Sequence, residues 1–187
     1  MDAFEQHASQ LVAGYAAALG IAAPDVRVVE GNVAPCYQAL FNRIEIDRRT
    51  LALPEPLLCL VVAHEVGHAT QRAALLTDFA WTLFGVAALL AAPCIMFAAL
   101  PGDDVWRVSI PGACFVLVLA SSYKAWRAHT ARRAMALELD ADAKAAQLCG
   151  ALPALHALEA MATRGPVHAA RLEALRDRLR ASDNRIG

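Results

Sequence analysis

The sequence predicts a mainly helical protein of the α+β class, with a small N-terminal antiparallel sheet and a transmembrane helical hairpin. Three observations lead to this prediction. The pentapeptide His64–His68 has the H-E-x-x-H pattern, strand-like segments precede it, and an uncharged apolar run from Phe79 to Leu100 follows it. Hydrophobic residues make up 58% of the 187 residues and charged residues 19%, which is more apolar than an ordinary soluble domain. We therefore expect a single domain, residues 1–187, into which a hairpin at residues 79–126 is inserted.

The N-terminal third predicts one helix and two strands. Asp2–Glu5 resembles a capping box that opens a helix ending near Gly20. Val26–Glu30 and Asn42–Asp47 have strand composition, the second with clean alternation, and Gly31–Pro35 between them is turn-like. A small antiparallel sheet is expected from these segments. Its edge could accept a peptide as an added strand, or the hairpin could simply support the helix that follows.

The H-E-x-x-H pattern predicts a zinc site. Residues four apart lie on one face of a helix, so His64 and His68 can both reach one zinc ion. Glu65 is then placed beside the open coordination position, where it can take a proton from a zinc-bound water. The apolar run Leu57–Ala63 leads into the motif and supplies the helical context. The alternative is a chance match on an amphipathic helix.

The centre of the chain predicts a pair of membrane spans. The run from Phe79 to Leu100 carries no charge and is long enough to cross a bilayer as a helix. A polar link at Pro101–Asp104 follows, and a second apolar run, Val108–Tyr123, is short for a span. Arg107 and Lys124 could snorkel from its ends and extend it. The alternative is a buried helical hairpin in a soluble core.

The basic residues predict the orientation of the hairpin. Arg72 precedes the first span and four basic residues follow the second, whereas the link carries only Arg107 beside two aspartates. By the positive-inside rule both flanks, and with them the zinc site, face the cytoplasm. The three tryptophans fall near the ends of the apolar runs, as in an interfacial belt. We expect an integral membrane protein in contact with the lipid bilayer.

Charge and cysteine usage exclude other classes. The net charge is −1 and the basic residues form no docking stripe, so no nucleic-acid partner is expected. The five cysteines are widely spread and contain no C-x-x-C pair, which favours reduced thiols over a disulfide framework or a cysteine zinc site.

The segment after the hairpin supplies candidates for a third zinc ligand. Ser121–Gly150 predicts one long helix, followed by amphipathic helices near Pro153–Thr163 and Val167–Ala181. Glu138 and Asp142 are four apart, so one could bind metal while the other orients a ligand histidine. The alternative is a solvated acidic face. The candidates on these segments are His129, Glu138, Asp140, Asp142, His156 and His168.

The two motifs together resemble those of membrane gluzincin metallopeptidases. His64–Gln71 reads H-E-V-G-H-A-T-Q and Glu138–Ala143 reads E-L-D-A-D-A, which is similar to the YugP-like neutral zinc metallopeptidases and to the HtpX-like and CAAX prenyl proteases. The resemblance covers about Val26–Ala146. It implies a gluzincin-like fold in a bacterial inner or plasma membrane. It also implies residue roles: zinc bound by His64, His68 and Glu138, Glu65 as general base, and Asp142 in support.

The chain departs from this family in three places. The two further spans that HtpX-like proteins have before the motif are absent. Met135 stands where many relatives carry an arginine, which Arg132 or Arg133 could replace. The tail Thr163–His168 matches a T-H-P-P element imperfectly, so we expect His168 to be a surface histidine. Several residues could stabilise the oxyanion of a tetrahedral intermediate: Tyr37, Tyr123, His129, His156 and the arginines.

The predicted function is that of a membrane-anchored zinc endopeptidase acting on a peptide or protein substrate. The first alternative is a non-catalytic membrane interaction protein with a structural or vestigial zinc site, although a structural site has no use for a base at Glu65. The second is a soluble minimal peptidase whose hydrophobic hairpin serves only as a lid.

Overall fold

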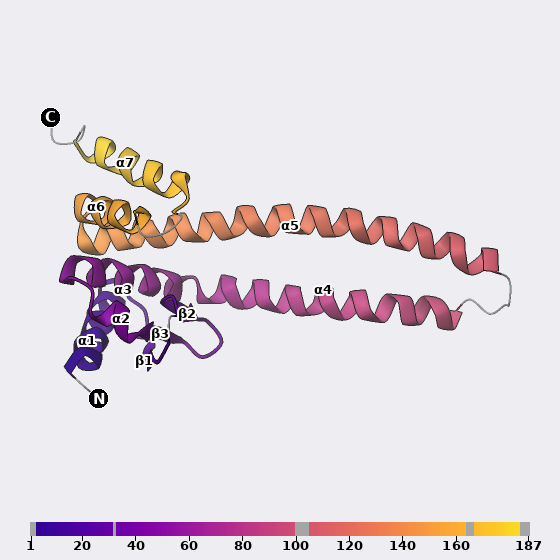
Figure 1. Cartoon of the computed structure of the whole chain (residues 1–187), viewed down its shortest axis with the longest axis horizontal. Coiled ribbons are helices and arrows are strands. Elements are labelled where there is room, and N and C mark those ends of the chain that lie inside the picture. Colours follow the sequence, from indigo (N-terminus) through magenta and orange to yellow (C-terminus); the bar gives the residue numbers. More distant parts are fainter. Residues whose placement is uncertain (1–2, 32, 100–104, 164–166, 184–187) are drawn as a thin grey trace. The chain divides into compact units, whose positions relative to one another are not determined.

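The computed structural model describes residues 3–31, 33–99, 105–163 and 167–183. The predicted cap at Asp2 and the link at 101–104 lie outside the described residues, as do residues 164–166 of the tail. The chain forms two compact units, one of Met1–Leu75 with Ala136–Gly187 and one of Leu76–Met135. Figure 1 shows the elements in chain order: α1 (Ala3–Ala18), β1 (Asp25–Val29), β2 (Cys36–Gln38), β3 (Arg43–Asp47), α2 (Arg48–Leu51), α3 (Glu55–Thr70), α4 (Arg72–Ala99), α5 (Val105–Cys149), α6 (Ala151–Ala162) and α7 (Ala169–Asp183).

The sheet is mixed, so the prediction of an antiparallel sheet is wrong. Its order is β1-β3-β2; β1 runs parallel to β3, with Val26 opposite Ile44, and β2 runs antiparallel to β3, with Tyr37 also opposite Ile44. Residues 30–42 are long enough for the crossover of about a dozen residues that a parallel pair requires. The alternating pattern identified both long strands, but alternation carries no information about strand direction. The central strand β3 is therefore covered on both edges, and β2 is an edge strand.

One hydrophobic core lies between the sheet, α1 and α3. Val12 of α1, Ile44 and Ile46 of β3, and Val62 and Val66 of α3 are almost fully buried and pack together. Ile44 and Ile46 alternate along β3, and Val62 and Val66 are four apart on α3, as each element's period requires. This core fixes α3 against the sheet and turns its other face toward the rest of the compact unit.

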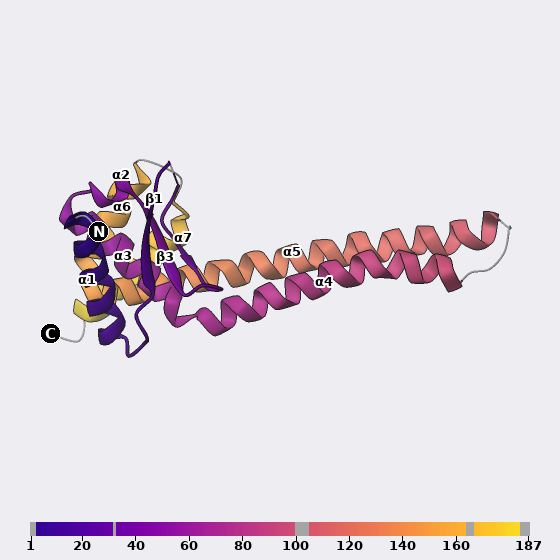
Figure 2. The same cartoon turned by 90° about the horizontal axis from the view of Figure 1, so that it is seen from below.

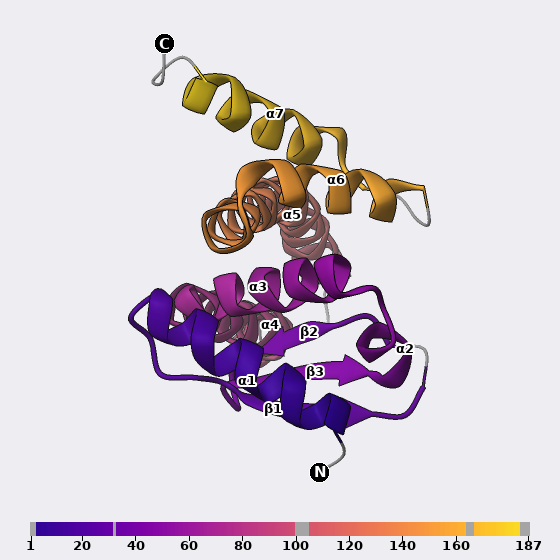
Figure 3. The same ribbon diagram turned by 90° about the vertical axis from the view of Figure 1, so that its left-hand side faces the viewer.

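A second core joins the two ends of the chain. Leu60 and Ala63 of α3 pack with Ala145 of α5, Leu158 of α6 and Leu175 of α7. Figure 3 shows the sheet, α3, the last part of α5, α6 and α7 stacked in that order. The three predicted C-terminal helices are confirmed, although the first of them is continuous with the preceding apolar segment in α5. Residues 136–149 thus reach α3 although the whole hairpin separates them in sequence.

The second unit contains most of α4 and the first part of α5, which run antiparallel (Figures 1 and 2). Its apolar side chains are exposed, for example Phe84, Leu90 and Leu117 at 65%, 65% and 68%. Within the described residues, one helix, Arg72–Ile95, is long and apolar enough to cross a membrane, with a mean hydropathy of 1.8 and none of that stretch buried. The predicted second span, Val108–Tyr123, is helical but does not meet the same criterion.

Candidate metal centre

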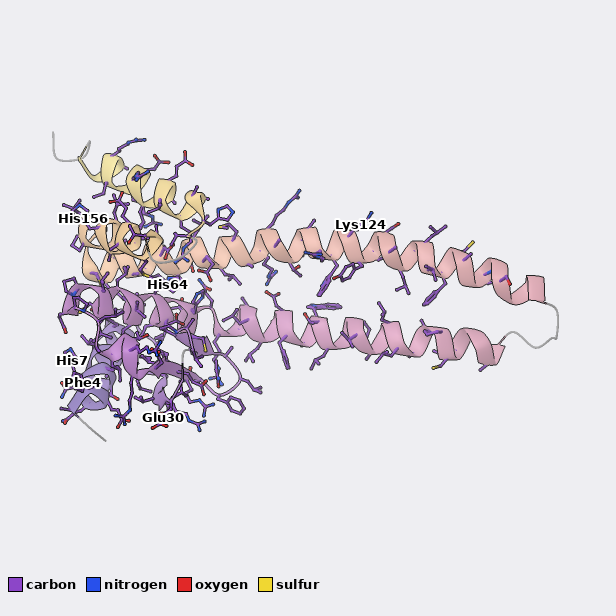
Figure 4. All side chains as sticks on the ribbon, viewed as in Figure 1. Phe4, His7, Glu30, His64, Lys124 and His156 are labelled. Atoms are coloured by element: carbon purple, nitrogen blue, oxygen red, sulfur yellow. The ribbon has the colours of Figure 1, made fainter. Side chains whose placement is uncertain are left out.

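Two histidines of α3 and one glutamate of α5 converge on a point between these helices. His64 and His68 lie on one face of α3, as their spacing predicts, and their Nε2 atoms are 3.2 Å apart. The Glu138 carboxylate approaches both: Oε2 is 3.4 Å from His64 Nε2, and Oε1 is 3.4 Å from His68 Nε2. Figure 4 shows His64 where α3 faces the last part of α5. The structure thus brings together the three residues proposed as ligands.

The spacing of these donor atoms fits a tetrahedral zinc ion. Two ligands bound at about 2.0–2.1 Å in a tetrahedral site stand roughly 3.4 Å apart. The 3.2 Å between the two Nε2 atoms is close to this value, and each Nε2 lies 3.4 Å from one of the two oxygens of the Glu138 carboxylate. With one ligand atom taken from each residue, the three atoms lie within 4.8 Å of one another, and two imidazoles with one carboxylate form a donor set that zinc accepts.

Asp142 orients His64 from the side opposite the ligand nitrogen. Its Oδ1 lies 2.9 Å from His64 Nδ1, although the alignment falls short of hydrogen-bond geometry for that buried nitrogen. The carboxylate is only 5% exposed. A carboxylate facing Nδ1 keeps the proton on that atom and leaves the Nε2 lone pair for a metal. The supporting role predicted for Asp142 is consistent with this geometry.

Arg171 of α7 connects the two carboxylates, and sequence reasoning did not single it out. Its Nε and Nη2 donate to Asp142 Oδ2 and Oδ1 at 2.6 and 2.7 Å, and Nη1 lies 3.1 Å from Glu138 Oε2. The bidentate geometry makes this a strong, oriented contact. Arg171 lies three residues after the tail Thr163–His168, which matches the T-H-P-P element imperfectly. This imperfect match was the only sequence signal that could have drawn attention to Arg171. The arginine near the site therefore comes from α7.

A second network orients His68. His68 Nδ1 lies 3.2 Å from Gln71 Oε1, and Gln71 Nε2 donates to the Leu137 carbonyl and to Asp140 Oδ2 at 2.9 and 2.7 Å. Since both of these partners are acceptors, the atom facing them must be the amide nitrogen. The amide oxygen then faces His68, whose Nδ1 must carry the proton. Lys144 in turn donates to Asp140. Asp140, one of the candidate third ligands, thus contacts Gln71 and Lys144 and is not part of the cluster of His64, His68 and Glu138.

Glu65 is a buried carboxylate beside the cluster. It is 7% exposed, and the backbone amide of Tyr37 in β2 donates a hydrogen bond to it. Burial raises the pKa of Glu65 above its usual range, against the opposing effects of His64 and His68. An elevated pKa suits a carboxylate that accepts a proton and later releases it.

Interactions between the charged groups raise the pKa of His64 and lower the pKa values of Glu138 and Asp142. Burial alone would lower the pKa of His64, but the contacts with Asp142 and Glu138 outweigh it and raise the pKa of His64 to about 9. The two histidines lower the pKa of Glu138 well below its usual range. Burial opposes the charge of Asp142, yet Arg171 and His64 lower its pKa as well. Glu138 and Asp142 are therefore both ionised, and their negative charges can balance the positive charge of a bound cation.

The other candidate residues do not join the cluster. His156 and His168 are exposed on α6 and just before α7, so the expectation of a surface histidine at 168 is confirmed. Tyr37 lines the cavity, but its hydroxyl donates to Asn42 Oδ1 at 2.8 Å. Tyr123 and His129 belong to the hairpin unit. Arg133 in the same unit pairs with Asp78 through Nε and Oδ2 at 2.7 Å.

A cavity of about 420 Å³ opens onto the cluster. Its lining includes residues of the edge strand β2 with the preceding Ala34 and Pro35, together with Leu158 and Met161 of α6 and Arg171 of α7. This volume is within the range of small-molecule and side-chain binding sites.

Comparisons with protein-family models, with curated proteins and with solved structures found no match for this chain.

Proposed function

We propose that this protein is a membrane-anchored zinc endopeptidase of the gluzincin type. The observation that carries the proposal is the convergence of His64 Nε2, His68 Nε2 and the Glu138 carboxylate at mutual distances of 3.2–3.4 Å, with a buried Glu65 beside them. A purely structural metal site needs no additional carboxylate next to the metal. A base at this position is what hydrolysis of a peptide bond requires.

The side chains around the cluster have distinct tasks in such a reaction. A zinc ion held by His64, His68 and Glu138 would supply a Lewis acid that polarises the scissile carbonyl and lowers the pKa of water to about 7. Glu65 accepts the proton of the attacking water and delivers it to the leaving amine. The burial that raises its pKa makes the first transfer easier, because a carboxylate with a higher pKa is a stronger base.

The test of catalysis is the Glu65→Gln variant, which preserves shape and removes the base. We expect it to retain zinc and to lose peptide cleavage, because general-base catalysis contributes at least about 10²–10⁴-fold. Glu55→Gln, on the exposed first turn of the same helix, is the matched control and should cleave normally. Proteomic comparison of cleavage products from wild type and Glu65→Gln would reveal substrates. Full activity of Glu65→Gln would exclude the proposed mechanism.

The test of the ligand set compares two acidic residues on α5. Glu138→Ala should reduce bound zinc sharply because it removes one of three ligands. Asp140→Ala should leave most of the zinc in place, because Asp140 contacts Gln71 and Lys144 and lies outside the ligand cluster. Elemental analysis of the purified full chain measures both. Equal zinc loss in the two variants would show that the third ligand is misassigned.

The membrane part of the proposal is supported by the apolar, unburied helix α4. We propose that the hairpin anchors the chain in the bilayer and that the centre faces the cytoplasm, where the basic flanks lie. A soluble helix of this composition would expose a long apolar surface to water. Alkaline carbonate extraction tests the anchoring: the chain should stay with the membrane pellet, and its release into the soluble fraction would refute the anchor.

A further inference from the structure

The turn between β2 and β3 holds two large apolar side chains in solvent. Leu40 and Phe41 occupy its tip and are 58% and 61% exposed. Neither belongs to the two hydrophobic cores of the compact unit. Single exposed apolar residues are common on proteins, so this pair acquires meaning only from what surrounds it.

The turn is held firmly by its neighbours. The Asn42 amide donates to the Ala39 carbonyl at 3.4 Å, and Asn42 adopts the left-handed conformation, with φ +49°, that asparagine tolerates better than most residues. Tyr37 donates to the Asn42 side chain at 2.8 Å. The guanidinium of Arg43 lies 5.0 Å from the centre of the Phe41 ring. These contacts fix the direction in which the tip points.

The same turn is tied to the first residue of the apolar helix. Arg72 Nε donates to the Ala39 carbonyl at 2.9 Å, and Arg72 begins both α4 and the candidate span Arg72–Ile95. Arg72 belongs to the same compact unit as the turn. In the described part of the chain no carboxylate pairs with Arg72, whereas Arg43 also pairs with Glu45 at 3.0 Å. The exposed apolar side chains of the turn therefore lie close to Arg72, which is both a cation without a carboxylate partner among the described residues and the first residue of the candidate span.

We propose that the Ala39–Asn42 turn is a membrane-surface anchor that inserts Leu40 and Phe41 into the interface of an anionic lipid bilayer at the level where α4 enters it. Apolar side chains gain free energy in the boundary between headgroups and acyl chains, and a nearby arginine is attracted to anionic headgroups. This inference rests on the membrane anchoring in the proposed function.

The anchor would determine which substrates reach the centre. Strand β2 leads directly into the turn, and its Tyr37 amide contacts Glu65. Phe41 is four residues from Tyr37, so the two are at most about 13 Å apart along the chain. A centre held this close to the bilayer acts on polypeptide segments that emerge from the membrane or lie on its surface.

Photo-crosslinking to lipid tests the anchor in the full chain. Benzoylphenylalanine replaces Phe41 in one variant and Phe4 in a matched control, because both phenylalanines are 61% exposed in the same compact unit. Figure 4 shows Phe4 at the beginning of α1, on the other side of that unit from the start of α4. The variants are irradiated in vesicles of phosphatidylcholine and phosphatidylglycerol, and lipid adducts are measured by mass spectrometry. We expect several-fold more lipid adduct at position 41.

Each outcome has one consequence. Equal adduct at positions 41 and 4, or adducts to protein alone at position 41, in a chain that resists carbonate extraction, overturns the surface anchor and leaves the hairpin anchor standing. Release of the chain by carbonate overturns both. The Glu65→Gln experiment remains independent of these results, so failure of the catalytic assignment is recognised separately.

Discussion

At the scale of single residues, each histidine of the candidate metal centre is oriented by its own acidic residue on α5. Asp142 faces His64 directly, and Asp140 acts on His68 through Gln71. Both arrangements leave the proton on Nδ1 and direct Nε2 toward the cluster. The two acids are two positions apart on α5, which places them on different sides of the helix. One short segment can therefore serve both histidines from different directions.

Gln71→Ala tests the relay to His68. The change removes the acceptor for His68 Nδ1–H, and we expect zinc affinity to fall about 10–100-fold, as for other residues that orient a metal-bound histidine. Nitrogen NMR of the His68 ring should also show loss of the single tautomer in the metal-free protein. Gln147→Ala, an exposed glutamine on α5, is the matched control. Unchanged affinity together with an unchanged tautomer would contradict the relay.

Zinc binding should release a proton at neutral pH. His64 has a pKa raised from 6.5 to about 9, so at pH 7 it is charged in the metal-free protein, and a metal must displace that proton. Affinity should therefore rise by about tenfold per pH unit from pH 7 and level off above about pH 9. Calorimetry in buffers of different ionisation enthalpy counts the released protons. In Asp142→Asn the rise should level off at lower pH, because a main cause of the raised pKa is removed.

The sequence predicted the positions of the candidate site residues best where the spacing of two residues determines that they share one face of a helix. The four-residue separations of His64 and His68 and of Glu138 and Asp142 each place two side chains on one helical face, and the structure has both pairs there. Arg171 was missed because its role depends on how α7 packs beside α5, and no local pattern encodes that packing.

At the scale of elements, the centre depends on a close approach between α3 and α5. A Cβ atom at Gly67 would lie 3.0 Å from both the Cα and the carbonyl oxygen of Ala141. Gly67 stands between the ligands on α3, and Ala141 stands between Glu138 and Asp142 on α5. The missing side chain therefore allows the two helices to meet where the candidate ligands His64, His68 and Glu138 come together.

Gly67→Ala should separate the two helices. Because the obstructing atoms are backbone, they cannot move out of the way cheaply, and we expect a loss of about 1–3 kcal/mol in unfolding free energy together with weaker zinc binding. Gly14→Ala on α1 has open space around it and should stabilise by about 0.5–1 kcal/mol. Chemical denaturation and zinc titration of both variants measure the difference. A Gly67→Ala protein as stable as wild type would show that the approach is looser than the structure indicates.

The helices were more predictable than the sheet for a physical reason. Helix ends carry local signals: the helix predicted to end near Gly20 ends at Ala18, and Gly150 follows α5 directly. Strand pairing is not local, so the parallel alignment of β1 with β3 could not be obtained from alternation. Strand β2 has only three residues and follows a turn-like segment, so it gave no recognisable pattern. Yet this strand supplies the amide that contacts Glu65.

At the scale of the whole molecule, the candidate metal centre is assembled from segments on both sides of the hairpin. The histidines precede the hairpin and Glu138 follows it, while the second core mixes side chains from the same two segments. A bound metal would therefore link segments whose association otherwise depends on packing alone. Its effect should extend through one compact unit and stop at the hairpin.

Zinc binding should slow amide hydrogen exchange both in α3 and in residues 136–149. A metal present at about 1,000 times its dissociation constant stabilises the state that binds it by about 4 kcal/mol, and every amide that exchanges only when the site opens gains that protection. All three tryptophans, Trp81, Trp106 and Trp126, belong to the hairpin unit, so fluorescence would miss this change and exchange measured by mass spectrometry is required. Amides of α4 beyond Leu75 should not respond. In Glu138→Ala the joint protection should disappear, whereas protection confined to α3 in the wild type would show that the second half of the chain supplies no ligand.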